Sequence, residues 1–183
     1  MKFRFSCVIT LLLLSGGSSS QAAEPSCHQS IGPQLSAKLA EQCRLVSPAT
    51  RPPCNVSNAC SAISEEIDRG CGMLRGGISM PSFCTTDIKK PETISGALIS
   101  GGGIDDLSIT IFTADGRRIQ AYCVGNCGDW FARTDGGDET VLSPRFAGRT
   151  VVLTVAPETN RSRIVGPSKD EKLIFVKQVR LNK

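Results

Sequence analysis

Residues 107–122 read LSITIFTADGRRIQAY and contain the clearest structural signal in the chain. The turn ADGRR, residues 114–118, joins the run LSITIFTA before it to the run RRIQAYCV after it. A Gly-containing connection between two such runs is typical of a β-hairpin. The turn is therefore predicted to join two neighbouring strands of a β-sheet region.

Residues 91–183 contain five runs of this kind, separated by loops rich in Gly, Asp, Asn and Ser. They are ISGALIS (94–100), LSITIFTA (107–114), RRIQAYCV (117–124), RTVVLTVA (149–156) and KLIFVKQVRL (172–181). The longest gap, from Phe131 to Gly148, separates the third run from the fourth. In strand number and gap position, residues 94–182 resemble a small exported bacterial OB-like barrel. The resemblance implies a five-stranded antiparallel β-barrel domain over residues 91–183.

Residues 24–90 show helical rather than alternating patterns. Leu35, Leu39, Cys43 and Val46 follow one another at helical spacing and predict a helix from about Pro33 to Leu45. Cys60, Ile63, Ile67 and Cys71 form a second such stripe, which Gly70 and Gly72 end. The predicted class is therefore α+β, with a disulfide-stapled two-helix segment followed by the OB-like barrel.

The first 23 residues are typical of a cleaved secretory signal peptide. Lys2 and Arg4 precede the apolar run SCVITLLLLS, and small residues up to Ala23 supply a cleavage site. The apolar run is too short to cross a bilayer comfortably. We therefore expect a mature chain without a stable membrane anchor, in the bacterial periplasm or outside the cell.

The chain has nine cysteines, of which Cys7 lies in the predicted signal peptide. An even set of eight in an exported chain is a disulfide framework by default. Six lie in residues 24–90, namely Cys27, Cys43, Cys54, Cys60, Cys71 and Cys84. Their pairing is open, but we expect Cys60 or Cys71 to reach Cys27 or Cys43. Because this segment is too small for a secure core, these bonds would be its main stabilisers.

The last two cysteines lie in AYCVGNCGDWF, residues 121–131. Three residues separate Cys123 from Cys127, whereas redox-active pairs have two intervening residues at a helix N-terminus. A zinc site would need more ligands, and the only histidine, His28, is distant in the sequence. We therefore predict a Cys123–Cys127 disulfide, with no metal and no cofactor.

The candidate binding residues are Tyr122, Trp130, Phe131 and Arg133. The only Trp of a small β domain usually belongs to the core, but neighbours on an extended segment point to opposite faces. One of the two adjacent rings would then be exposed near Arg133, which is typical of a binding hot spot. The sequence leaves open whether Trp130 contacts the core or a partner.

Several classes of function are excluded by what the chain lacks. Catalytic arrangements that need a histidine base have only His28, adjacent to a cysteine, so no catalytic residue is predicted. Catalysis by carboxylates alone stays possible. The formal net charge of +4 falls to +2 once Lys2 and Arg4 are removed, which gives no reason to expect a nucleic acid partner.

These observations favour an exported, non-catalytic binding or inhibitor protein that recognises another protein. The first alternative is a small carboxylate-dependent hydrolase that acts on envelope glycans. The second alternative is an OB barrel that binds oligonucleotides or anions. The oligomeric state is left open by the sequence.

Overall fold

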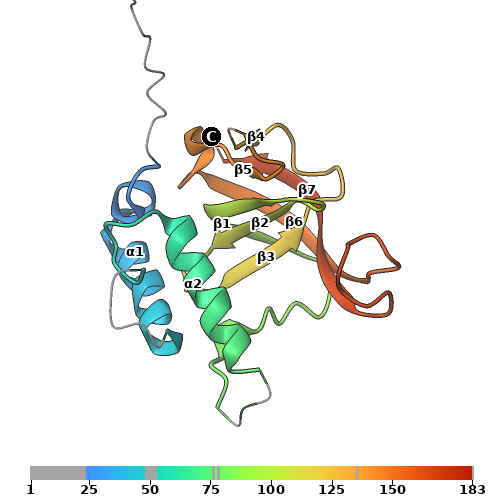
Figure 1. The fold of residues 1–183 in the computed structure, drawn as a ribbon, viewed down its shortest axis with the longest axis horizontal. Helices are drawn as coiled ribbons and strands as arrows, with labels where there is room; N and C mark the ends of the chain where they lie inside the picture. Colours follow the sequence, from blue (N-terminus) through green and yellow to red (C-terminus); the bar gives the residue numbers. More distant parts are fainter. Residues whose placement is uncertain (1–23, 48–52, 76, 78, 135, 183) are drawn as a thin grey trace, which may run out of the picture.

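The computed structural model describes residues 24–47, 53–75, 77, 79–134 and 136–182. The predicted signal peptide, residues 1–23, lies outside them. Two helices lie side by side against a β-barrel, so the predicted α+β class is confirmed (Figure 1). In the described part of the chain, no helix has the length and apolarity needed to cross a membrane.

The sheet contains seven strands. They are β1 (Glu92–Gly103), β2 (Ser108–Phe112), β3 (Arg118–Tyr122), β4 (Phe131–Arg133), β5 (Thr140–Leu142), β6 (Thr150–Thr159) and β7 (Lys172–Leu181). Five of them close the barrel in the order β1-β2-β3-β7-β6 and back to β1. These are the five predicted strands, and the hairpin of residues 107–122 is formed by β2 and β3.

The β4–β5 hairpin lies in the gap for which no strand was predicted. Each of its strands has three residues, which is too short for an alternating pattern to be recognised. The hairpin pairs with the end of β1 through Gly102 and Gly103. A one-turn 3₁₀ helix, η2 (Pro144–Phe146), then leads the chain towards β6.

The prediction of a purely antiparallel barrel is wrong at one pair of strands. β3 and β7 are parallel and pair at Tyr122 and Phe175. The other four contacts around the ring are antiparallel. Since a closed ring of five strands cannot alternate direction at every step, one parallel pair is unavoidable.

The two helices are α1 (Cys27–Val46) and α2 (Cys60–Met73). α1 begins six residues before the predicted Pro33. Ser26 and Gln29 form a capping box at its start, and Gly32, with φ 78°, interrupts the helix before Pro33 restarts it. The prediction from Pro33 onward therefore describes the second part of α1, and the capping box explains the first.

Four disulfides are formed among the described residues, and three of them fasten the helical segment. Cys27–Cys60 joins the starts of the two helices, as expected from the sequence. Cys43–Cys54 and Cys71–Cys84 tie each helix to the loop that follows it, and the loop after α2 contains the 3₁₀ helix η1 (Ser82–Cys84).

The barrel has its own core, and the helices share a second core with it. The barrel core contains fully buried Leu98, Ile109, Ile111, Val151 and Leu153, among others. The second core combines Leu39, Ile63 and Ile67 of the helices with Ala97, Ile99 and Phe112 of β1 and β2. Helices and barrel therefore bury apolar surface against each other.

A polar contact also joins the helices to the barrel. The Arg118 side chain at the start of β3 is 7% exposed, and its Nη2 donates to the Asp68 carboxylate of α2 at 2.5 Å. Its Nη1 donates to Ser64 Oγ at 3.2 Å. Because a buried cation is stable only when it is paired, these contacts fix the position of α2 on the barrel.

We expect Asp68→Asn to lower the free energy of unfolding by about 1–2 kcal/mol, because it leaves the buried Arg118 without a counter-charge. The loss should be less than for a fully buried pair, since the Asp68 side chain is 48% exposed. Urea denaturation measures the change. Asp105→Asn, at an exposed loop position, is the matched control and should change the value by less than about 0.5 kcal/mol. Equal effects of the two substitutions would contradict this role of Arg118.

Candidate functional site

A groove of about 730 Å³ lies between α2, the outer face of β1, β2 and β3, and the β4–β5 hairpin. Its floor is made of glycines, of residues with a hydroxyl group, and of one glutamine. They are Ser100, Gly101, Gly102, Gly103, Ser108, Thr110 and Gln120. Small side chains therefore leave the groove open, and their polar groups are available for hydrogen bonds to a ligand.

The glycines of β1 let neighbouring backbone approach the groove. A Cβ on Gly102 would lie 2.1 Å from the Thr140 carbonyl oxygen, and one on Gly103 would lie 2.0 Å from that of Asp106. Both glycines have positive φ, at 139° and 154°, where side chains are disfavoured. A larger residue at position 102 would push away the β4–β5 hairpin, which forms one wall of the groove, and one at position 103 would displace the loop between β1 and β2.

Carboxylates dominate the walls of the groove. Ser61, Glu65 and Asp68 lie on one face of α2, with Glu24 next to them and Glu139 on the opposite hairpin. Ser61 Oγ donates to the Glu24 carboxylate at 2.9 Å. Among the described lining residues there are four acids and one base, Arg133. The groove is therefore acidic, although the chain as a whole has a positive formal charge.

Among the carboxylates that line the groove, Glu65 has a raised pKa. Partial burial raises the pKa of this carboxyl, and the negative charges of Glu139, Glu24 and Asp68 raise it further. A proton or a positively charged ligand group at this position would relieve the repulsion. Among the described residues, no three His, Cys, Asp or Glu side chains are grouped so that they could hold a metal ion.

The four binding residues proposed from the sequence do not meet at one place. Trp130 is buried, with 8% exposure, and its ring lies 5.6 Å from that of Phe146. Tyr122 is half-buried, with its ring 6.2 Å from that of Phe175. Phe131 is half-buried against the barrel core. Only Arg133 is exposed and lines the groove, so a binding role for all four stays a prediction.

The structure forms the Cys123–Cys127 disulfide that the spacing predicts. Both cysteines are buried in the barrel core. The Cys123 amide donates to the Leu107 carbonyl at 2.8 Å, and the Asn126 amide donates to that of Cys123 at 2.6 Å. The pair therefore fixes the turn after β3, and Trp130, three residues after Cys127, lies in the same core.

The acids of the groove were missed from the sequence because they come from separate segments. Glu24, Glu65 and Glu139 lie far apart along the chain, and no local pattern connects them. The one available signal was in α2, where Ser61, Glu65 and Asp68 share a face at helical spacing. That face could have been predicted to be polar, but not to face a groove.

We expect Trp130→Ala to destabilise the protein by about 3–5 kcal/mol, as for other large-to-small core substitutions. The physical reason is the loss of ring contacts with Phe146 and with the barrel core. Denaturant titration followed by far-UV circular dichroism measures the loss. An unchanged unfolding midpoint would show that Trp130 is not part of the core.

We expect Glu65→Gln to make the protein more stable than the wild type at pH 7. The raised pKa means that the folded state binds the proton more tightly than the unfolded state, so wild-type stability falls as pH rises from the ordinary to the raised pKa. The difference between variant and wild type should vanish below about pH 4, where glutamate is protonated in both states. Unfolding curves at several pH values measure it.

The exposed Glu41, on α1 and outside the groove, provides the control as Glu41→Gln. A Glu65→Gln variant that is less stable than the wild type at pH 7 would rule out the repulsion among the groove carboxylates.

Comparisons with known proteins identify no protein that is similar to this chain. The chain matches no protein-family model, no curated protein and no solved structure.

Proposed function

We propose that the protein is an exported, non-catalytic binding protein of the periplasm or the extracellular space, and that it recognises a protein partner through the acidic groove. Its four disulfides are compatible with an oxidising compartment. The observation that carries the proposal is the groove itself, whose walls come from both the helical segment and the barrel.

The partner's contact region is proposed to carry lysine or arginine. Four carboxylates line the groove, and the repulsion that raises the pKa of Glu65 is relieved by a cationic side chain. Ser108, Thr110 and Gln120 on the floor offer hydrogen bonds to a polypeptide backbone. Complementary charge of this kind increases both the rate of association and specificity.

The strand order of the barrel supports an OB-like assignment, which in turn favours the groove as the binding site. The ring β1-β2-β3-β7-β6 matches the five-stranded OB layout proposed from the sequence, with β4 and β5 as an inserted hairpin. OB-type barrels bind ligands on the face of their second and third strands. Ser108, Thr110 and Gln120 lie on β2 and β3 and line the groove.

One alternative is favoured by a specific observation. A carboxyl with a raised pKa beside other carboxylates is the arrangement that carboxylate-dependent glycosidases use as a general acid. Glu65, with Glu139 or Asp68 as its partner, would fill that role in a hydrolase of envelope glycans. The other alternative, an oligonucleotide- or anion-binding barrel, is disfavoured because the groove would repel phosphate.

Charge reversal tests the proposal. The mature protein is used to isolate a stoichiometric partner from the native envelope, and its affinity is then measured by calorimetry. We expect Glu65→Lys combined with Glu139→Lys to weaken binding at least about tenfold, without lowering thermal stability. Glu41→Lys combined with Glu171→Lys, at exposed positions outside the groove, makes the same change in net charge and should bind like the wild type.

Two outcomes would contradict the proposal. If the groove variant binds the partner as tightly as the wild type, the groove is not the interface. If instead the wild type cleaves peptidoglycan or related glycans and Glu65→Gln abolishes turnover, the hydrolase alternative holds.

A further inference from the structure

β3 lacks a neighbouring strand along part of one edge. On one side it pairs with β2 at five positions, from Ser108–Tyr122 to Phe112–Arg118. On the other side it pairs with β7 only where Tyr122 meets Phe175. Among the described residues, no strand therefore pairs with that edge of β3 before Tyr122.

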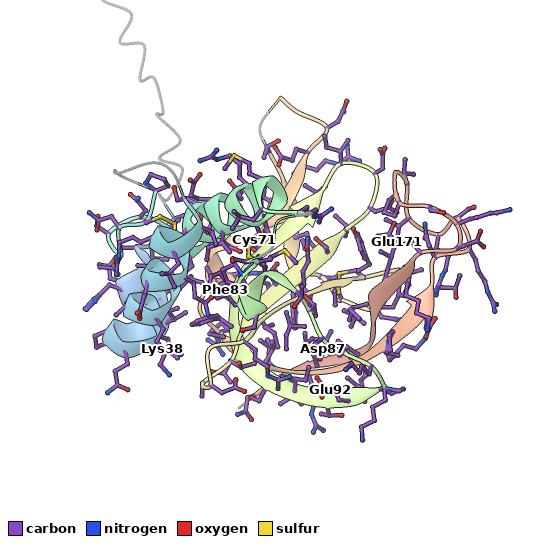
Figure 2. The ribbon with its side chains drawn as sticks, turned by 90° about the horizontal axis from the view of Figure 1, so that it is seen from below. Lys38, Cys71, Phe83, Asp87, Glu92 and Glu171 are labelled. Atoms are coloured by element: carbon purple, nitrogen blue, oxygen red, sulfur yellow. A yellow bond between two sulfur atoms is a disulfide. The ribbon has the colours of Figure 1, made fainter. Side chains whose placement is uncertain are left out.

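The connector of residues 85–90, between η1 and β1, passes close to this edge. Figure 2 shows its course from Phe83 past Asp87 to Glu92 along the barrel. Ile88 is buried in the barrel core. Within the described structure, the backbone groups of residues 86–90 form no hydrogen bonds with other backbone groups. The connector therefore lies over the barrel without pairing with it as a strand.

A pocket of about 400 Å³ lies between this connector, α1 and the β2–β3 turn. This volume falls within the range of about 300–1,000 Å³ that is typical of small-ligand sites. Phe83, Ile88 and Ile119 contribute apolar surface to it. The pocket is separate from the acidic groove, and the two have no lining residue in common.

Two buried polar atoms of residues that line this pocket have no hydrogen-bond partner in the described structure: Gln42 Oε1 and Arg118 Nε. Gln42 already donates from Nε2 to the Gly116 carbonyl at 2.7 Å. Arg118 uses Nη1 and Nη2 for Ser64 and Asp68. Two residues that line the pocket therefore carry one unmatched acceptor and one unmatched donor, both covered by neighbouring protein atoms, and buried groups in native proteins are rarely left so.

We propose that this pocket binds an extended peptide segment. A peptide group carries one carbonyl acceptor and one N–H donor, which match Arg118 Nε–H and Gln42 Oε1. The unpaired edge of β3 and the connector backbone offer further partners, as in other cases of peptide binding to a sheet edge. Both atoms are covered by protein, so binding requires a small side-chain movement.

Charge argues for a neutral ligand group at this place. An anion would satisfy only Arg118, and it would meet the carboxylates of Asp87 and Asp115 in the lining. A cation would satisfy only Gln42. Arg117 is already paired with Asp115 and Glu92, so it adds no free positive charge. A neutral group that carries both a donor and an acceptor meets both requirements, and the peptide amide is the group of this kind that recurs along an extended chain.

The test uses the full-length mature protein, labelled with ¹⁵N and with its disulfides intact. The probe is an acetylated and amidated peptide of four alanines, titrated at millimolar concentration. We expect saturable NMR shifts of the backbone amides of residues 85–88 and 116–119 and of the Arg118 Nε–H. An analogue with one central amide replaced by an ester lacks that N–H donor and should bind about five- to tenfold more weakly.

Gln42→Leu removes the acceptor and should weaken binding of the peptide by about five- to tenfold. Gln34→Leu, at an exposed position of the same helix, is the matched control and should have no effect. Should Gln42→Leu fail to fold, the comparison of amide and ester peptides on the wild type decides.

The proposal is overturned if no saturable shifts occur, or if the amide and ester peptides bind equally. It is also overturned if a crystal soaked with the peptide shows only water on Gln42 Oε1 and Arg118 Nε. Because the peptide carries no charge and the pocket shares no residue with the acidic groove, the outcome is independent of the function proposed for the groove.

Discussion

The buried guanidinium of Arg118 determines how the two parts of the molecule fit together. It belongs to β3, but Ser64 and Asp68, which accept its hydrogen bonds, belong to α2. If α2 moved along the barrel, a buried cation would lose its counter-charge, which is more costly than the loss of an exposed ion pair. The acidic groove depends on this constraint, because α2 forms one of its walls and Asp68 is one of its carboxylates.

The helical segment is stabilised by disulfides and by the barrel together. Three disulfides restrict its chain, yet its apolar face still packs on Ala97, Ile99 and Phe112. A segment of this size cannot bury enough surface alone. Close packing also matters between the helices, where a Cβ on Gly70 would lie only 2.6 Å from the Val46 carbonyl oxygen. The disulfides therefore hold the helical segment together, while apolar packing and the Arg118–Asp68 ion pair hold α2, one wall of the groove, on the barrel.

Local patterns in the sequence were sufficient for the five barrel strands and for most of the two helices, but not for the β4–β5 hairpin or the site. The β2–β3 hairpin and the five barrel strands follow from alternation and turn residues, which act over a few positions. The β4–β5 hairpin is too short to show alternation, and Trp130 could be assigned to the core only when Phe146 was placed beside it. Glu24, Glu65 and Glu139 converge through tertiary structure alone. Likewise, the edge of β3 lacks a partner because of how the ring closes.

Local charge decides what each surface can bind, and the net charge of the chain does not. At physiological salt, interactions between exposed charges are screened beyond about 8 Å. A ligand in the groove therefore responds to four nearby carboxylates and Arg133, and not to the formal charge of +4. In the pocket beside β3, the neighbouring charges are already paired, as Arg117 is with Asp115 and Glu92. We therefore propose that the groove selects for positive charge and the pocket for neutral hydrogen-bonding groups. Arg118 lies between them, with its Nη2 on the groove carboxylate Asp68 and its side chain in the lining of the pocket.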